Sequence, residues 1–184
     1  MNLTAQSVTL METAKLALPE KTTDAGVEAR TLLAECANPS SPWWTTQADA
    51  LTCMQLMDRV LWNRMSDPGK FNARGAKSLA DIVRAPNQFA GFDHYPNYDP
   101  SIVRNIQNML DISNRDGDAR RMAYRAFVEA AINIALGTRI DDPSPGMLAA
   151  WKTQNAKSPG PNFKPYKSLL NNTFYYVEKV TTSP

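Results

Sequence analysis

Glu35 is the residue whose sequence surroundings best suit catalytic chemistry. A helical period over residues 25–38 gathers apolar side chains on one face, namely Ala25, Ala29, Leu32, Leu33 and Cys36. Glu35 lies at the margin of that face. A carboxyl group in this position is partly desolvated, so its pKa rises and it can hold a proton near neutral pH, as a general acid must. The same pattern also fits an ordinary solvated glutamate at the boundary of an amphipathic helix.

The composition indicates one compact domain and argues against several classes of function. The chain has 184 residues, of which 43% are hydrophobic, enough for a substantial core. The formal net charge is +2 and no basic stripe is visible, which argues against nucleic acid as a partner. No apolar run is long enough to span a bilayer. The single histidine, His94, has no cysteine or histidine at ligand spacing, so neither a metal site nor a cofactor is expected.

Caps, breakers and hydrophobic periods predict a mainly helical (α+β) fold with a small amount of β-sheet. Helices are predicted over residues 4–18, 25–38, 47–65, 79–83, 100–113, 119–136 and 147–153, and a strand over residues 172–178. The expected N-caps are Asp24, Thr46, Ser78, Asp99 and Asp118. The helix that ends at Leu136 carries apolar residues over more than half its circumference, so we expect it to be the central buried helix.

Two charged residues and the two cysteines have structural interpretations. Arg64 projects into the apolar stripe of its helix, where a charge should be paired or should cap the helix end. Glu129 is the chief rival for a second carboxylate role, but an ion pair with Arg125 explains it more simply. Cys36 and Cys53 lie on consecutive helices, either as two buried free thiols or as a disulfide in an oxidising compartment.

Residues 84–96 and the pair Trp43-Trp44 are the aromatic segments that lack a helical period. The first is too irregular for a core element and too aromatic for a solvated linker. Loops of this kind on a rigid scaffold often form binding clefts. The two tryptophans either stack on a sugar ring or fold back onto the domain.

Four motifs lie in order along residues 24–178. They are Ala29 to Ala37 around Glu35, Val60 to Arg64 ending in Asn-Arg, Val83 to Phe89 ending in Gln-Phe, and the pair formed by Gly137 to Ser144 and Asn171 to Tyr175. In this order they resemble the motifs of the SleB-like cell-wall hydrolases, a family typified by a spore cortex-lytic enzyme. The chain departs from the family at residues 36–39, where Cys-Ala-Asn-Pro replaces Ala-Arg-Gly-Glu, and at Asn172, which replaces a histidine.

The resemblance implies one lysozyme-like domain over residues 24–180, preceded by an N-terminal helix and linker at residues 1–23. It also implies cleavage of the β-1,4 bond between N-acetylmuramic acid and N-acetylglucosamine in peptidoglycan. Glycosidases generally use two carboxylates. Here only Glu35 stands at a motif position, which favours a lytic transglycosylase with one catalytic acid. A hydrolytic muramidase and an inactive peptidoglycan-binding module are the alternatives.

The same resemblance assigns substrate contacts. Gln88 would hydrogen-bond a sugar or its N-acetyl group, and aromatic side chains would wall the cleft, namely Phe89, Phe92, Tyr95 and Tyr175. The enzyme would be a monomer that acts on peptidoglycan in the periplasm or cell wall. Because no signal peptide is visible in residues 1–18, it would arrive as a phage lysin, as an injected toxin, or from a precursor with a leader. A toxin would imply a cognate inhibitor protein that plugs the cleft.

Overall fold

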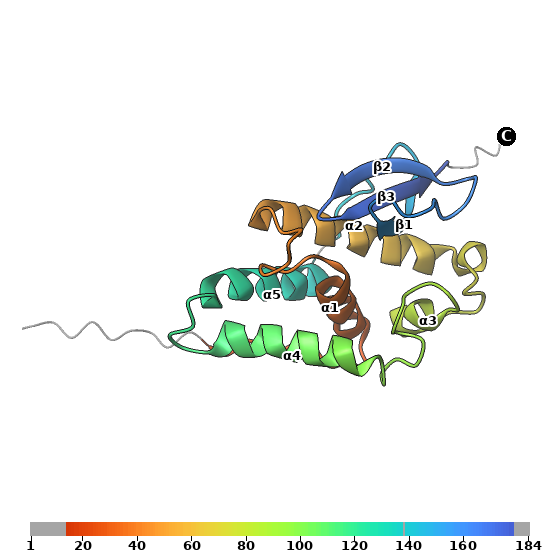
Figure 1. Ribbon diagram of the computed structural model, residues 1–184. Helices are drawn as coiled ribbons and strands as arrows, with labels where there is room; N and C mark the ends of the chain where they lie inside the picture. Colours follow the sequence, from red (N-terminus) through yellow and green to blue (C-terminus); the bar gives the residue numbers. More distant parts are fainter. Residues whose placement is uncertain (1–13, 138, 179–184) are drawn as a thin grey trace, which may run out of the picture.

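The computed structural model describes residues 14–137 and 139–178, which form a mixed α+β fold (Figure 1). Within these ranges five α-helices precede a three-stranded antiparallel sheet of strand order β1-β3-β2. The helices are α1 (Asp24–Glu35), α2 (Gln47–Ser66), α3 (Leu79–Arg84), α4 (Pro100–Asn114) and α5 (Arg121–Leu136), with a 3-10 turn η1 (Pro68–Phe71) after α2. The strands are β1 (Met147–Thr153), β2 (Lys164–Leu169) and β3 (Asn172–Val177). The expected combination of helices with a small sheet is confirmed.

Helix α2 lies between the sheet and the α4–α5 hairpin (Figure 1). Strand β1 and helix α5 both pack against α2, and α1 packs against α5, α2, α3 and α4. Ten of the 20 residues of α2 are buried, against four of the 16 in α5. The prediction that α5 is the central helix is therefore wrong. Its apolar surface includes small alanines and the exposed Met122 and Leu136, so much of it faces solvent.

Three predicted N-caps are confirmed, those of Thr46, Ser78 and Asp99. Ser78 and Asp81 form a reciprocal capping box at the start of α3. Proline at the first position of α4 supplies the backbone angle that a helix start needs.

Two other caps differ from the prediction. Helix α1 is capped by Thr23, whose hydroxyl accepts from Gly26 N, because the Asp24 carboxylate is used elsewhere and accepts from Leu79 N at 2.8 Å. The helix also ends at Glu35, three residues before the predicted end, because Cys36 is extended. Asp118 does not cap α5, since its carboxylate binds Arg120 in the preceding turn.

Residues 147–153 form a strand where a helix was predicted. Leu148, Ala149 and Ala150 favour a helix by intrinsic propensity. In the structure β1 pairs antiparallel with β3 from Met147↔Val177 to Thr153↔Asn172, and all three of those residues are buried. Tertiary pairing therefore overrides the local preference. The predicted strand over residues 172–178 is confirmed as β3.

Strand β2 was not predicted, because its sequence resembles a loop. It contains Pro165 and exposed lysines, and it pairs only with β3. An edge strand tolerates a proline because its outward N–H has no neighbour to bind.

The N-terminal segment before α1 is fixed by backbone contacts. Most of the predicted helix over residues 4–18 lies outside the described residues, and residues 14–18 are not helical. The backbone of Leu16 exchanges two hydrogen bonds with the Asn114 side chain, at 2.7 and 2.9 Å. At the start of α1 a Cβ on Gly26 would lie 1.9 Å from the carbonyl oxygen of Glu20, so glycine is required for this close approach.

A buried pair of acids lies between α1 and α2. Glu28 and Asp58 are each about 1% exposed. The Trp62 indole N–H donates to Glu28 Oε2 at 3.0 Å, and the Arg139 guanidinium lies 3.9 Å from Asp58 Oδ1. Burial, together with a hydrogen bond to Asp58, raises the pKa of Glu28 to about 8. The raised pKa favours the protonated form of the Glu28 carboxyl at neutral pH.

Both cysteines are buried and free in the structure. The Cys36 thiol donates to the Ala50 carbonyl oxygen at 3.8 Å, and its contact with the Cys53 thiol, together with burial, raises its pKa. A thiol that is buried and held protonated is a poor nucleophile.

We therefore expect Cys36 and Cys53 to react with a thiol-specific disulfide reagent such as DTNB only after denaturation, when two thiols should be counted. The spectrophotometric count is made on native and on denatured, non-reduced protein. Rapid reaction of the native protein would show that the thiols are accessible. A count of zero after denaturation would show that they form a bridge.

Candidate active site

Glu35 lies at the C-terminal end of α1, between two hollows of the surface. The hollow toward α4, here called the α4-side hollow, has a volume of about 310 Å³ and the hollow toward α2, the α2-side hollow, about 400 Å³. Glu35, Thr153 and Asn172 line both. Glu35 is thus the acid at the junction of a groove that continues to either side of it.

Partial burial shifts the Glu35 carboxyl toward its protonated form. Burial raises its pKa, and a hydrogen bond from the Trp151 indole N–H to Oε2, at 3.1 Å, opposes this by lowering it. The position at the end of α1 acts in the same direction as burial, because the last carbonyls of a helix disfavour a nearby negative charge. The arrangement can store a proton and release it to a bound group, which is the chemistry of a general acid.

Asn172 fixes the backbone beside this acid. Its side-chain amide on β3 donates to the Glu35 carbonyl oxygen at 3.2 Å. The residue is 8% exposed and reaches both hollows. Asn172 is therefore a neutral donor that joins β3 to the end of α1.

The Asn63-Arg64 pair at the end of α2 holds strand β1. Asn63 Nδ2 donates to the Leu148 carbonyl oxygen and Arg64 Nε to that of Ala149, both at 2.8 Å. Asn63 also donates to Asp142 Oδ2 at 2.7 Å. The motif ending in Asn63-Arg64 and the one containing Asp142 therefore meet beside β1. Together they hold the strand that carries Trp151. Arg64 is therefore structural, but through bonds to β1 and the loop after α3 and not through the ion pair or helix cap that its sequence position predicted.

Arg64 also links β1 to the loop that follows α3. A terminal nitrogen of its guanidinium donates to Gln88 Oε1, and the group lies over the ring of Phe89 at 5.3 Å from the centroid. Phe89 in turn packs on Trp151, with ring centroids 5.3 Å apart. Gln88 and Phe89 both line the α2-side hollow.

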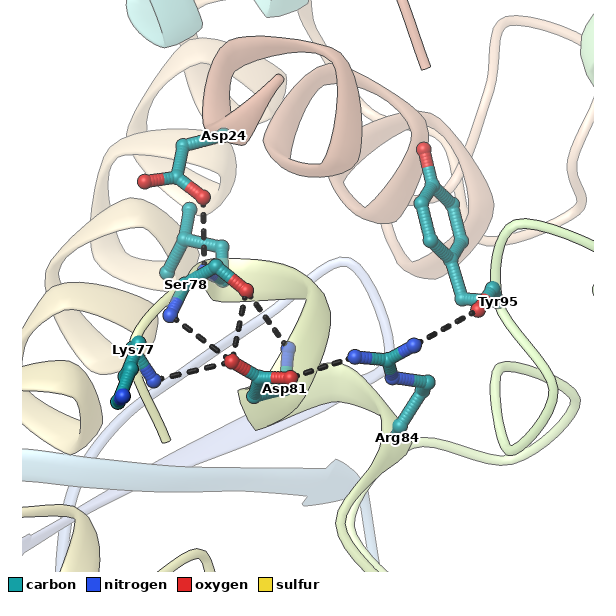
Figure 2. Close-up of polar contacts among 7 residues, drawn as sticks. Asp24, Lys77, Ser78, Asp81, Arg84 and Tyr95 are labelled. Atoms are coloured by element: carbon teal, nitrogen blue, oxygen red, sulfur yellow. Dashed lines mark hydrogen bonds and ion pairs between the residues drawn. The ribbon is translucent and has the colours of Figure 1, made fainter. Parts of the chain in front are cut away.

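The loop over residues 84–96 is anchored at its ends by the polar contacts in Figure 2. Asp81 accepts from the backbone N–H groups at the start of α3, and its other oxygen binds Arg84 at 2.5 Å. Arg84 reaches across to the Tyr95 carbonyl oxygen at 3.5 Å. At the other end of α3, Asp24 ties the helix to α1. The loop is therefore held against the helix that bears Glu35.

The predicted site residues fall into two groups. Glu35, Gln88 and Phe89 line the α2-side hollow together. Phe92, Tyr95 and Tyr175 line neither hollow and are buried, with 0%, 2% and 8% of their surfaces exposed.

The buried aromatics stabilise the loop and the sheet. Phe92 and Tyr95 stack with Tyr98, and the Tyr95 hydroxyl donates to the Lys21 carbonyl oxygen at 2.6 Å. Tyr175 lies in the central strand β3. Phe92, Tyr95 and Tyr175 therefore pack inside the protein. They do not line the cleft, contrary to what the resemblance had led us to expect.

The groove lining also includes Trp151, Lys70 and Lys152, which were not nominated from the sequence. Trp151 was not recognised as a groove residue because its segment was predicted to be helical. Trp43 is 56% exposed and lines the α4-side hollow, whereas its neighbour Trp44 packs edge-on against Phe127. Trp44 thus folds back onto the domain, and stacking of Trp43 on a sugar stays a prediction.

Among the described residues, Glu35 is the only carboxylate that lines either hollow. Glu129 forms the ion pair with Arg125 that its spacing predicts, at 2.9 Å on α5. The described residues contain no group of three or more histidine, cysteine or acidic side chains placed to hold a metal ion. The chemistry available to the groove therefore centres on one acid.

Comparison of the chain with models of protein families, with curated proteins and with solved structures found no match. In the part of the chain that the structure describes, no helix is long and apolar enough to cross a membrane.

Replacing Trp151 by phenylalanine should raise the pKa of Glu35, because an aromatic ring is kept while the only side-chain donor to its carboxylate among the described residues is removed. The measurement is an NMR titration of the Glu35 carboxyl carbon in glutamate-labelled protein. Trp62→Phe, which removes the corresponding indole donor from Glu28, is the matched control and should leave the Glu35 titration in place. An unchanged or lowered pKa in Trp151→Phe would contradict the assigned hydrogen bond.

Proposed function

We propose that this protein is a peptidoglycan lytic transglycosylase of lysozyme-like fold, with Glu35 as its single catalytic acid. One observation carries the proposal: a partly buried carboxyl with a raised pKa lies at the junction of two hollows that contain no second carboxylate among the described residues. A glycan strand needs such a groove, with sugars on both sides of the bond that breaks. The four motifs that resemble the SleB-like hydrolases support the same assignment.

The single acid determines the chemistry. Glu35 would protonate the glycosidic oxygen as the bond from that oxygen to the anomeric carbon breaks. The resulting carboxylate would take the proton of the 6-hydroxyl of the same N-acetylmuramic acid residue, whose oxygen then bonds to the anomeric carbon. The products are a 1,6-anhydro end and a free 4-hydroxyl, with no water consumed and the acid restored. A muramidase would need a further group to position water.

The remainder of the proposal concerns where the enzyme acts. Its substrate lies in the periplasm or cell wall. The enzyme would reach it through a secretion system, by phage lysis, or as a precursor with a leader. In the toxin case an inhibitor protein would have to cover the groove around Glu35.

Glu35→Gln should abolish glycan cleavage, with a loss of at least about 100-fold, because glutamine keeps the shape of the side chain but carries no acidic proton. Glu129→Gln is the matched control, since Glu129 is paired on α5 and lies outside both hollows. Purified peptidoglycan is incubated with each protein and the fragments are analysed by mass spectrometry. Circular dichroism confirms that both variants fold.

Each result of that assay has one meaning. Anhydro ends from wild type and Glu129→Gln, but not from Glu35→Gln, support the transglycosylase. Reducing ends would instead identify a hydrolytic muramidase. No release by wild type would identify a module that binds without cutting. Cleavage by Glu35→Gln at the wild-type rate would refute the catalytic role of Glu35.

Cleavage should also decline as the pH rises through the folded pKa of Glu35. That pKa is raised, so the protonated form required for the first step persists above the usual range of a glutamate and is then lost. Initial rates on solubilised glycan across pH 4 to 10 test this, with folding checked at each pH. A rate that stays constant to the alkaline end would rule out a general acid with a raised pKa.

A further inference from the structure

The two hollows beside Glu35 differ in charge. The α2-side hollow contains three cationic residues, Arg64, Lys70 and Lys152. The α4-side hollow contains none, and its polar lining consists of neutral groups such as Asn38, Ser41, Asn105 and Asn171. Apart from Glu35 itself, the groove lining is therefore neutral on the α4 side of the acid and positive on the α2 side.

Arg64 is the reason to regard this charge as part of a binding site. The residue is 8% exposed, and burial lowers the pKa of its guanidinium to about 10. No described acidic residue lies within ion-pair distance of it. Its hydrogen bonds go to two neutral oxygens, those of Ala149 and Gln88. A buried cation without a counter-charge costs stability, and a bound anion would offset that cost.

Lys70 and Lys152 approach the same hollow from opposite elements. Lys70 belongs to η1 and Lys152 to β1, and both are exposed. Neither takes part in an ion pair among the described residues. The aromatic rings of Phe71, Phe89 and Trp151 lie in the same lining. The hollow therefore combines flat apolar surfaces, which suit a sugar ring, with cations from two sides.

We propose that the α2-side hollow binds the carboxylate-bearing sugar of the glycan, while the α4-side hollow takes its neutral neighbour. This inference rests on the proposed function and specifies how the strand lies in the groove. In peptidoglycan only one of the two alternating sugars carries a lactyl group, which ends either in a free carboxylate or in a peptide with carboxylates of its own. Because the proposed reaction breaks the bond at the anomeric carbon of that acidic sugar, its place in the α2-side hollow then fixes the direction of the strand relative to Glu35.

The test compares acidic and neutral glycans in the Glu35→Gln background, where binding is measured without cleavage. Lys70→Gln and Lys152→Gln are combined in one variant. Arg64 is left unchanged, since it also holds β1. Isothermal titration calorimetry is performed with three ligands: peptidoglycan fragments that carry peptides, strands stripped by an amidase, and the neutral hexamer of N-acetylglucosamine.

The double variant should bind the acidic ligands on the order of fivefold to tenfold more weakly, since it loses two solvent-exposed charges. Its affinity for the neutral hexamer should be unchanged. Lys21→Gln combined with Lys77→Gln is the matched control, because it removes the same charge from two exposed lysines outside both hollows. That control should bind all three ligands as the parent does.

The outcomes separate this inference from the function on which it rests. Weakening with both acidic ligands assigns the lactyl carboxylate, and weakening only with peptide-carrying fragments assigns the peptide. Equal weakening for the neutral hexamer, or no weakening at all, overturns the inference while leaving glycan binding in place. If no ligand binds the parent protein, the proposed function and the inference both fail.

Discussion

The hydrogen bond from the Trp151 indole to the Glu35 carboxyl joins the first helix of the domain to its sheet across 116 residues of sequence. The site depends on this contact, because α1 alone would leave its last residue at an open helix end. Trp151 can reach Glu35 only while β1 is held in place, on one side by β3 and on the other by Asn63 and Arg64 of α2. The environment of the acid is thus a property of the completed fold.

The parts of the site set by local sequence could be predicted. The helical period around Glu35 placed that acid at the edge of an apolar face, and the turn-rich composition of residues 84–96 predicted a non-helical loop beside a cleft. The ion pair of Arg125 with Glu129 followed from spacing alone. In each case the deciding interactions lie within a few residues of one another, where helix geometry fixes which side chains meet.

The parts set by long-range pairing could not be predicted in this way. Trp151 lies in a segment whose alanines and leucine favour a helix, and only pairing with β3 makes it a strand. Phe92 and Tyr95 appeared suited to a cleft wall because aromatic residues in a loop suggest a binding surface. Their stacking with Tyr98 turns them into a small core under the loop. Burial of this kind depends on which surface the loop folds against, and composition does not encode that surface.

Helix α1 carries two acids whose pKa values the fold raises. Glu28 and Glu35 are seven residues apart, two helical turns, and therefore lie on the same side of the helix. The pKa of Glu28 is raised to about 8 from the ordinary value of 4.5, and that of Glu35 is raised as well. An unfolded chain would release both protons at lower pH, so unfolding near neutral pH is accompanied by proton release. The free energy of unfolding then decreases as the pH climbs from about 4.5 toward 8. Helix α1, which bears Glu35, is therefore stabilised at acidic pH, and a rise in pH both lowers the stability of the fold and removes the proton from Glu35.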